Sequence, residues 1–111
     1  ADGSSLLLRE LACALWSMVD GNAENQSAIA EAGGVPRLIH LLGKKTRPVH
    51  QDASGVLWSL AELESNRRAI AEAGGIQPLV TLVSEGDAGA QRTAAGALHN
   101  LAARAENRVQ A

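Results

Sequence analysis

A seven-residue sequence, Ala-Ile-Ala-Glu-Ala-Gly-Gly, occurs twice in this chain, at residues 28–34 and 69–75. Each copy predicts a short helix that ends at a glycine pair, where a second helix begins at a sharp angle. The first glycine can adopt the left-handed conformation that ends a helix, and the second lets the next backbone approach closely. A compact domain with a single core does not need two helix corners of identical sequence. The duplication therefore indicates a repeat protein.

The repeat length follows from residues outside the duplicated sequence. The chain has an asparagine every 41 residues, and apolar residues recur at the same spacing. Leu15-Trp16-Ser17-Met18 matches Leu57-Trp58-Ser59-Leu60 at a spacing of 42. The residues that recur at a spacing of 41 include three asparagines, Asn25, Asn66 and Asn107. Two pairs of leucines have the same spacing: Leu38 with Leu79, and Leu57 with Leu98. An internal period of this length is typical of a solenoid.

One repeat contains three predicted helices. Residues 24–32 form a short first helix, and 35–43 form a second, with Pro36 in its first turn and an apolar stripe at Leu38, Leu41 and Leu42. A longer third helix is predicted from about Pro48 to Leu63. Capping residues stand at equivalent positions before the third helices, namely Ser4, Thr46 and Asp87. No segment alternates as a strand does, so the predicted fold is all-α.

Composition limits the class of protein. Apolar residues make up 46% of the chain, but there is no Phe or Tyr and there are only two Trp, so the core is predicted from Leu, Ala, Ile and Val. A formal net charge of −2 disfavours nucleic acid as a partner. The single cysteine, Cys13, excludes an internal disulfide, and no apolar run has membrane-spanning length. We expect an intracellular chain, cytoplasmic or nuclear, with no membrane partner.

This arrangement resembles the armadillo repeat. The resemblance is carried by residues 24–42 and by Ala94-Ala-Gly-Ala-Leu-His-Asn-Leu-Ala102, and it extends over essentially the whole chain. It implies a right-handed α-α superhelix with about two full three-helix repeats and a partial repeat at each end. The implied single domain, 1–111, divides into a third helix at 4–20, repeats at 24–63 and 65–104, and the start of a further repeat at 105–111.

The resemblance also implies a function. In armadillo arrays the third helices line a concave face that binds extended peptides. Importin-α-like members carry a Trp there and, four residues later, an Asn that holds the main chain of the ligand. The matching Trp positions here are Cys13, Gly55 and Gly96, and the matching Asn positions are Ser17, Ser59 and Asn100. Only Asn100 keeps the pattern, so binding of basic nuclear-localisation peptides in the importin manner is not expected.

A different set of residues is predicted to line the face. Trp16, Trp58 and His99 directly precede the three Asn-type positions, and Arg9, Gln51 and Arg92 lie earlier on the same helix faces. Trp and Arg often anchor interfaces, and an Asn amide can bond both ends of a peptide unit. We therefore expect a groove for a protein or peptide segment, with acidic side chains facing Arg9 and Arg92. The predicted peptide-binding residues are Arg9, Trp16, Ser17, Gln51, Trp58, Ser59, Arg92, His99 and Asn100. The alternative for both tryptophans is that they pack as core between adjacent third helices.

A second hypothesis concerns assembly. Neither end of the chain shows a polar capping repeat, and Leu6-Leu7-Leu8 is a run of apolar residues. This favours a homo-oligomer formed through the chain ends, in which residues 105–111 of one molecule complete a repeat of another. A monomer with frayed ends is the simpler alternative.

No feature of the sequence predicts catalysis. His40, His50 and His99 are assigned to different elements and have no Cys, Asp or Glu at ligand spacing, so no metal or other cofactor is expected. Cys13 has no evident base and is predicted to be a small packed residue. The glycine pairs lack the Lys-Ser/Thr of a phosphate loop. The basic residues Lys44, Lys45 and Arg47 are interpreted as a solvated turn. The chain is therefore predicted not to be an enzyme.

Overall fold

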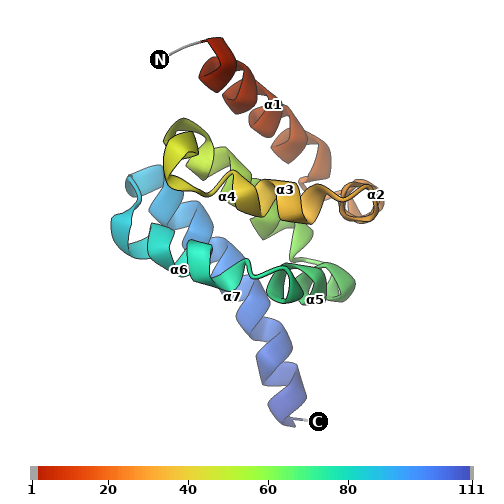
Figure 1. Ribbon diagram of the computed structural model, residues 1–111. Helices are drawn as coiled ribbons and strands as arrows, with labels where there is room; N and C mark the ends of the chain where they lie inside the picture. Colours follow the sequence, from red (N-terminus) through yellow and green to blue (C-terminus); the bar gives the residue numbers. More distant parts are fainter. Residues whose placement is uncertain (1–2, 111) are drawn as a thin grey trace.

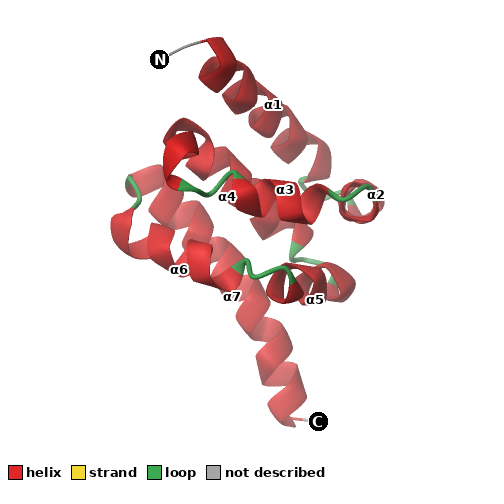
Figure 2. Ribbon diagram, viewed as in Figure 1, coloured by secondary structure: helices red, strands yellow, loops and turns green. Residues whose placement is uncertain are grey.

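The structure is a computed structural model that describes the backbone of residues 3–110 and the side chains of residues 6–43 and 46–103. Within these residues the chain forms helices and connecting turns, and no strand (Figure 2). The helices are α1 (Gly3–Val19), α2 (Ala23–Glu31), α3 (Gly34–His40), the 3₁₀ helix η1 (Lys44–Val49), α4 (His50–Leu60), α5 (Glu64–Glu72), α6 (Ile76–Glu85) and α7 (Ala88–Gln110). The predicted all-α fold is confirmed.

The helices stack as an armadillo-like solenoid in which α1, α4 and α7 are the successive third helices. α4 packs against α1 on one side and against α7 on the other. The pairs α2–α3 and α5–α6 lie beside this row, and both α2 and α3 contact α5 of the next repeat (Figure 1). The two ends of the chain therefore lie at opposite ends of the stack.

Both glycine corners have the predicted geometry. Gly33 and Gly74 have φ angles of 87° and 81°, in the left-handed region that other residues adopt at a cost. A Cβ atom on Gly34 would lie 2.7 Å from Cγ2 of Ile29, so the second glycine does allow the close approach. The same contact at Gly75 involves Ile70.

The core follows the predicted apolar stripes. In α4 the stripe consists of fully buried side chains, and α3, α6 and α7 contribute matching residues to the same cluster. The buried apolar residues include Leu38 and Leu42 of the predicted stripe, Ala53, Val56, Leu57 and Leu60 of α4, and Ala94, Ala97 and Leu101 of α7, whereas Leu41 is only partly buried. Burial of these faces between neighbours is what fixes the third helices side by side.

The predicted start and end of the middle third helix are wrong. α4 begins at His50 and ends at Leu60, and the residues before it form η1, with Thr46 at non-helical angles (φ −117°, ψ 34°). Thr46 does not cap the helix, because its hydroxyl donates backwards to the carbonyl oxygens of Leu41 (2.7 Å) and Gly43 (3.1 Å).

The other two predicted caps have different outcomes. An Asp87 carboxylate oxygen accepts from the backbone N–H of Ala90 at 2.9 Å, so the cap of α7 is confirmed. Ser4 lies outside the described side chains. α7 continues without a break to Gln110, through residues that the sequence assigned to a further repeat. The division of the chain into repeats at the predicted bounds stays a prediction.

A pair of polar side chains, equivalent in the repeat, joins each third helix to the next short helix. Gln26 Nε2 donates to the carbonyl oxygen of Val19 at 2.9 Å, and Arg67 Nη1 donates to that of Ala61 at 2.8 Å. Carbonyl groups at a helix C-terminus have no partner inside the helix, so these bonds satisfy them. They also tie the ends of α1 and α4 to the short helices that follow, α2 and α5.

Candidate functional site

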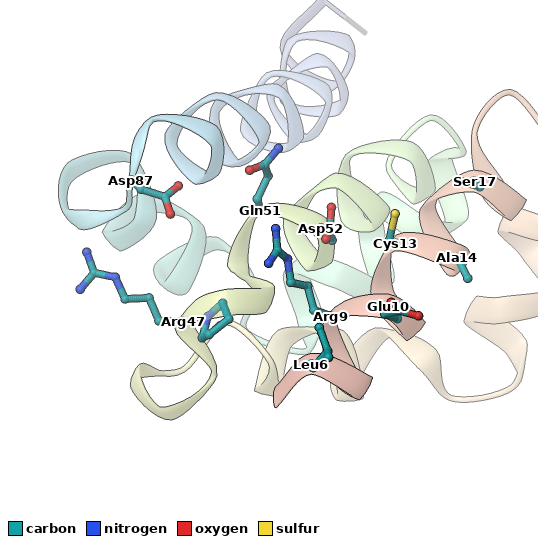
Figure 3. A pocket seen from close by; sticks show the side chains of 11 residues that line it. Leu6, Arg9, Glu10, Cys13, Ala14, Ser17, Arg47, Gln51, Asp52 and Asp87 are labelled. Carbon is teal, nitrogen blue, oxygen red and sulfur yellow. The ribbon is translucent and has the colours of Figure 1, made fainter. Parts of the chain in front are cut away.

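The face formed by the third helices carries an open hollow of about 780 Å³ between α1 and the start of α4. Three of the predicted binding residues line it: Arg9, Ser17 and Gln51. Figure 3 shows the Arg9 side chain reaching from α1 toward Gln51 on α4, while Arg47 and Asp87 lie on the other side of Gln51. Side chains from three separate helical segments therefore meet here.

This hollow carries charges of both signs. The side chains of Arg9 and Arg47 supply positive charge, and those of Glu10, Asp52 and Asp87 supply negative charge. A ligand with acidic side chains throughout would therefore meet three carboxylates as well as two arginines in this hollow.

A second hollow, of about 410 Å³, adjoins the first along the same face. It is lined by Gln51, Trp58 and Arg92 together with Ala88, Gly89 and Thr93 of α7. Gln51 belongs to both hollows, and a Cβ atom on Gly89 would overlap its side chain. Gln51 therefore lies at the boundary between the two hollows, against the N-terminal turn of α7.

Both tryptophans are half-buried and contact the next third helix. A Cβ atom on Gly55 would lie 2.6–2.7 Å from Cδ2, Cε2 and Cε3 of Trp16, so the indole lies face-on over that glycine. Trp58 covers Gly96 in the same way. The glycines at the family's Trp positions thus receive the tryptophan of the preceding third helix.

The two indoles also line a third hollow, of about 320 Å³, together with Asp20, Ser59 and Glu62. The tryptophans consequently belong both to the seam between third helices and to the exposed face. The packing of both rings against the next third helix is thus observed, and a role of their exposed parts in binding a ligand stays a prediction.

The remaining predicted residues lie differently. Ser59 is only 5% exposed. Asn100 donates from Nδ2 to the carbonyl oxygen of Trp58 at 3.0 Å, which joins α7 to α4. His99 is exposed, and neither it nor Asn100 lines any of the three hollows.

The structure corrects one sequence interpretation and adds residues that the sequence missed. Cys13 is exposed and lines the first hollow, so its prediction as a packed residue is wrong. Asp20 and Glu62 were missed, although each stands four residues after a tryptophan and the two are 42 residues apart. That shared spacing is the signal that could have found them.

The described residues contain neither a metal-binding cluster nor a helix that could span a membrane. Among them, no group of three or more His, Cys, Asp or Glu side chains could hold a metal ion. None of the described helices has the length and apolar character that crossing a membrane requires.

Comparison with known proteins places the chain in a family. The sequence model of the armadillo/β-catenin-like repeat matches residues 22–62 and 64–103. The crystal structure of an engineered protein is similar, with a TM-score of 0.80 and 29% sequence identity. That similarity covers 89% of this chain but 40% of the engineered protein. No curated protein gives a significant match. Since the two matched segments take up more than half of the chain, it belongs to the armadillo/β-catenin-like repeat family.

Proposed function

We propose that this chain binds a segment of another protein along the face formed by α1, α4 and α7. Membership of the family supports a non-enzymatic protein-interaction module in general. The observation that carries the specific proposal is the pair of adjoining hollows that share Gln51 and are lined by Arg9 on one side and Arg92 on the other.

The dimensions of the face fit an extended segment. Packed helices lie about 8–10 Å apart, and an extended chain rises about 3.3 Å per residue, so about three ligand residues pass each third helix. A segment that crosses all three helices therefore needs only about six to nine residues.

The charges on the face define the ligand further. Arg9 and Arg92 stand two repeats apart, with the neutral Gln51 at the equivalent position between them. Acidic ligand side chains about six residues apart would meet the two arginines. Carboxylates such as Glu10 and Asp52 line the same hollow as Arg9, which disfavours a ligand with acidic residues throughout.

Selection from a random 12-residue peptide library, followed by fluorescence polarisation with the selected peptides, tests this proposal. We expect Arg9→Ala and Arg92→Ala each to weaken binding by about tenfold, as removal of an interface arginine commonly does. Arg68→Ala is the matched control, because Arg68 is exposed on α5 and lines none of the three hollows. Selected peptides that bind both groove variants as tightly as they bind the parent would refute the proposal.

A second proposal, self-association, has its own observation. Leu7 and Leu11 are 68% and 56% exposed on α1, whereas the equivalent residues of the next repeat, Val49 at the end of η1 and Ala53 of α4, are fully buried. Beside Leu11, an apolar hollow of about 470 Å³ separates α1 from α3. At the other end of the stack, Ile76, Val80 and Val83 of α6 are also exposed. Association of copies through these ends would cover both apolar surfaces.

Light scattering over a concentration series tests self-association. We expect the average mass to rise with concentration for the parent chain and to stay monomeric for the double variant Leu7→Glu, Leu11→Glu. A strictly monomeric parent at every concentration would rule the idea out. The predicted exchange of residues 105–111 lies outside the described side chains.

A further inference from the structure

We propose that the hollow between Trp16 and Trp58 binds a cationic side chain, namely an ammonium or guanidinium group of the bound segment. This inference rests on the proposed segment binding and assigns a ligand chemistry to one part of the same face. It concerns the third hollow, of about 320 Å³, at the C-terminal ends of α1 and α4.

The lining of the hollow is unlike that of the other two. It consists of two indoles, two carboxylates and one hydroxyl, from Trp16, Trp58, Asp20, Glu62 and Ser59, and it includes no cationic side chain. An indole ring attracts a cation through its negatively polarised face, and carboxylates attract it through their charge. Every strongly interacting group in the lining therefore favours the same kind of ligand.

The indoles are held in place by the backbone beneath them. Each ring lies over a glycine of the next third helix, at Gly55 and at Gly96, where a side chain would occupy its place. Because both rings are also half-buried, little conformational freedom is left for a ligand to remove.

The carboxylates of Asp20 and Glu62 lie at helix C-termini, where the helix dipole does not offset their negative charge. Asp20 directly follows α1, and Glu62 follows Ala61, the C-cap of α4. A helix C-terminus carries partial negative charge, so a carboxylate there adds to the negative potential. Neither helix has a basic residue in its last turn. A bound cation would compensate both sources of negative charge.

One cation does reach the end of α4, but from outside the hollow. Arg67 Nη1 donates to the carbonyl oxygens of Ala61 (2.8 Å) and Glu62 (3.1 Å). The equivalent residue at the end of α1 is the neutral Gln26, which donates to Val19. At the end of α1, therefore, the residue equivalent to Arg67 supplies no positive charge to offset the negative potential of the helix C-terminus.

Gln26 also positions one of the carboxylates. It is 2% exposed, and its Nε2 donates to Oε1 of Glu62 at 2.7 Å in addition to the carbonyl of Val19. The bond uses one carboxylate oxygen, so Oε2 can accept from a ligand. Gln26 is accordingly a positioning residue for the site.

The two tryptophans allow a direct test, because they are the only Trp residues in the chain and both line the hollow. In ¹⁵N NMR spectra the indole N–H signal of Trp16 reports on this hollow, whereas Trp58 also lines the second hollow, so binding at this site must shift both signals. The probe is N-acetyl-trimethyllysine amide, compared with its neutral isostere in which carbon replaces the quaternary nitrogen. We expect saturable shifts of both indole signals with the cation and about fivefold weaker binding of the isostere.

Variants separate charge from shape. Glu62→Gln keeps an oxygen that can accept from Gln26, and Asp20→Asn keeps the side-chain size, so each should lower the affinity for the cation by about three- to tenfold without unfolding the chain. Glu72→Gln, at an exposed position on α5, is the matched control. Equal binding of cation and isostere, or unchanged affinity in both carboxylate variants, would overturn the proposal.

The outcome can be told apart from that of the proposed function. If selected peptides lose affinity with Arg92→Ala but not with Glu62→Gln, segment binding stands and the cation site falls. If no peptide is selected, segment binding falls, and the indole titration still decides whether the hollow binds a cation.

Discussion

The indole of Trp58 on α4 covers Gly96 on α7, and the side chain that a larger residue would place on Gly96 has no room beneath the ring. Trp16 and Gly55 repeat the relationship one third helix earlier. The middle third helix, α4, therefore carries both partners: its Gly55 lies under Trp16 of α1, and its Trp58 lies over Gly96 of α7. This contact both sets the spacing of the third helices and leaves part of each ring on the functional face.

The contact predicts a change of sign in a double-mutant cycle. Trp58→Ala should cost about 2 kcal/mol, less than the roughly 3–5 kcal/mol of a fully buried ring. Gly96→Ala should cost about 1–3 kcal/mol in the parent, because the added methyl group displaces the indole. In the Trp58→Ala background the same change should stabilise by about 0.5–1 kcal/mol, since alanine favours a helix interior over glycine. Urea unfolding of the four proteins measures the cycle, and additive effects would contradict the contact.

Gln26 predicts a second effect on stability. Gln26→Leu should destabilise the chain by about 1–3 kcal/mol, because the two hydrogen bonds that the buried amide donates, to the carbonyl oxygen of Val19 and to Oε1 of Glu62, are lost. The exposed Gln77 on α6 provides the control, and Gln77→Leu should change stability by less than about 0.5 kcal/mol. Urea midpoints at constant m-value measure both. Equal effects of the two changes would show that the buried amide bonds contribute nothing specific.

Asp87, which caps α7, and Thr46, which stands at the equivalent position but does not cap α4, predict unequal effects of substitution. Asp87→Ala should cost about 1 kcal/mol, and Asp87→Asn should retain most of that stability, because an amide oxygen can also accept from the N–H of Ala90. Thr46→Ser should be nearly neutral, since its hydroxyl needs only to reach the carbonyls of Leu41 and Gly43. Thermal melts compare the three variants. A larger loss from Asp87→Asn than from Asp87→Ala would exclude capping as the cause.

The sequence predicted those features that depend on neighbouring residues alone and that occur in both repeats. The glycine corners and the buried stripes follow from backbone freedom and helical periodicity, and repetition at a fixed spacing reinforced both. The start of α4 was missed because the Thr46 hydroxyl has two kinds of partner, backbone N–H groups ahead and carbonyls behind, and spacing alone does not choose between them.

The candidate site was only partly predictable for a different reason. Arg9, Gln51, Trp58 and Arg92 were found because they sit at repeat-equivalent positions on helices. Which of them share a hollow depends on how neighbouring third helices pack. Asp20 and Glu62 recur at the same spacing as the two tryptophans, but that both carboxylates share one hollow with both indoles emerges only when α1 and α4 are placed side by side.

The first glycine of each corner gives the last prediction, which separates fold from function. A Cβ atom on Gly74 would meet no atom within 4 Å, so any cost of substitution comes from its left-handed backbone and not from a clash. Gly74→Ala should therefore cost about 1–2 kcal/mol, Gly74→Asn less, and Gly74→Val more, in the order in which these residues tolerate positive φ. The same order should hold at Gly33.

Urea unfolding and peptide binding together check this last prediction. At temperatures where the Gly74→Asn variant is fully folded, its affinity for a selected peptide should match that of the parent, because the corner lies away from the three hollows. Ala73→Val, at the neighbouring exposed position with an ordinary helical φ of −81°, provides the control. A Gly74→Val protein that unfolds at the same urea concentration as the parent would refute the role of the left-handed glycine in forming the corner.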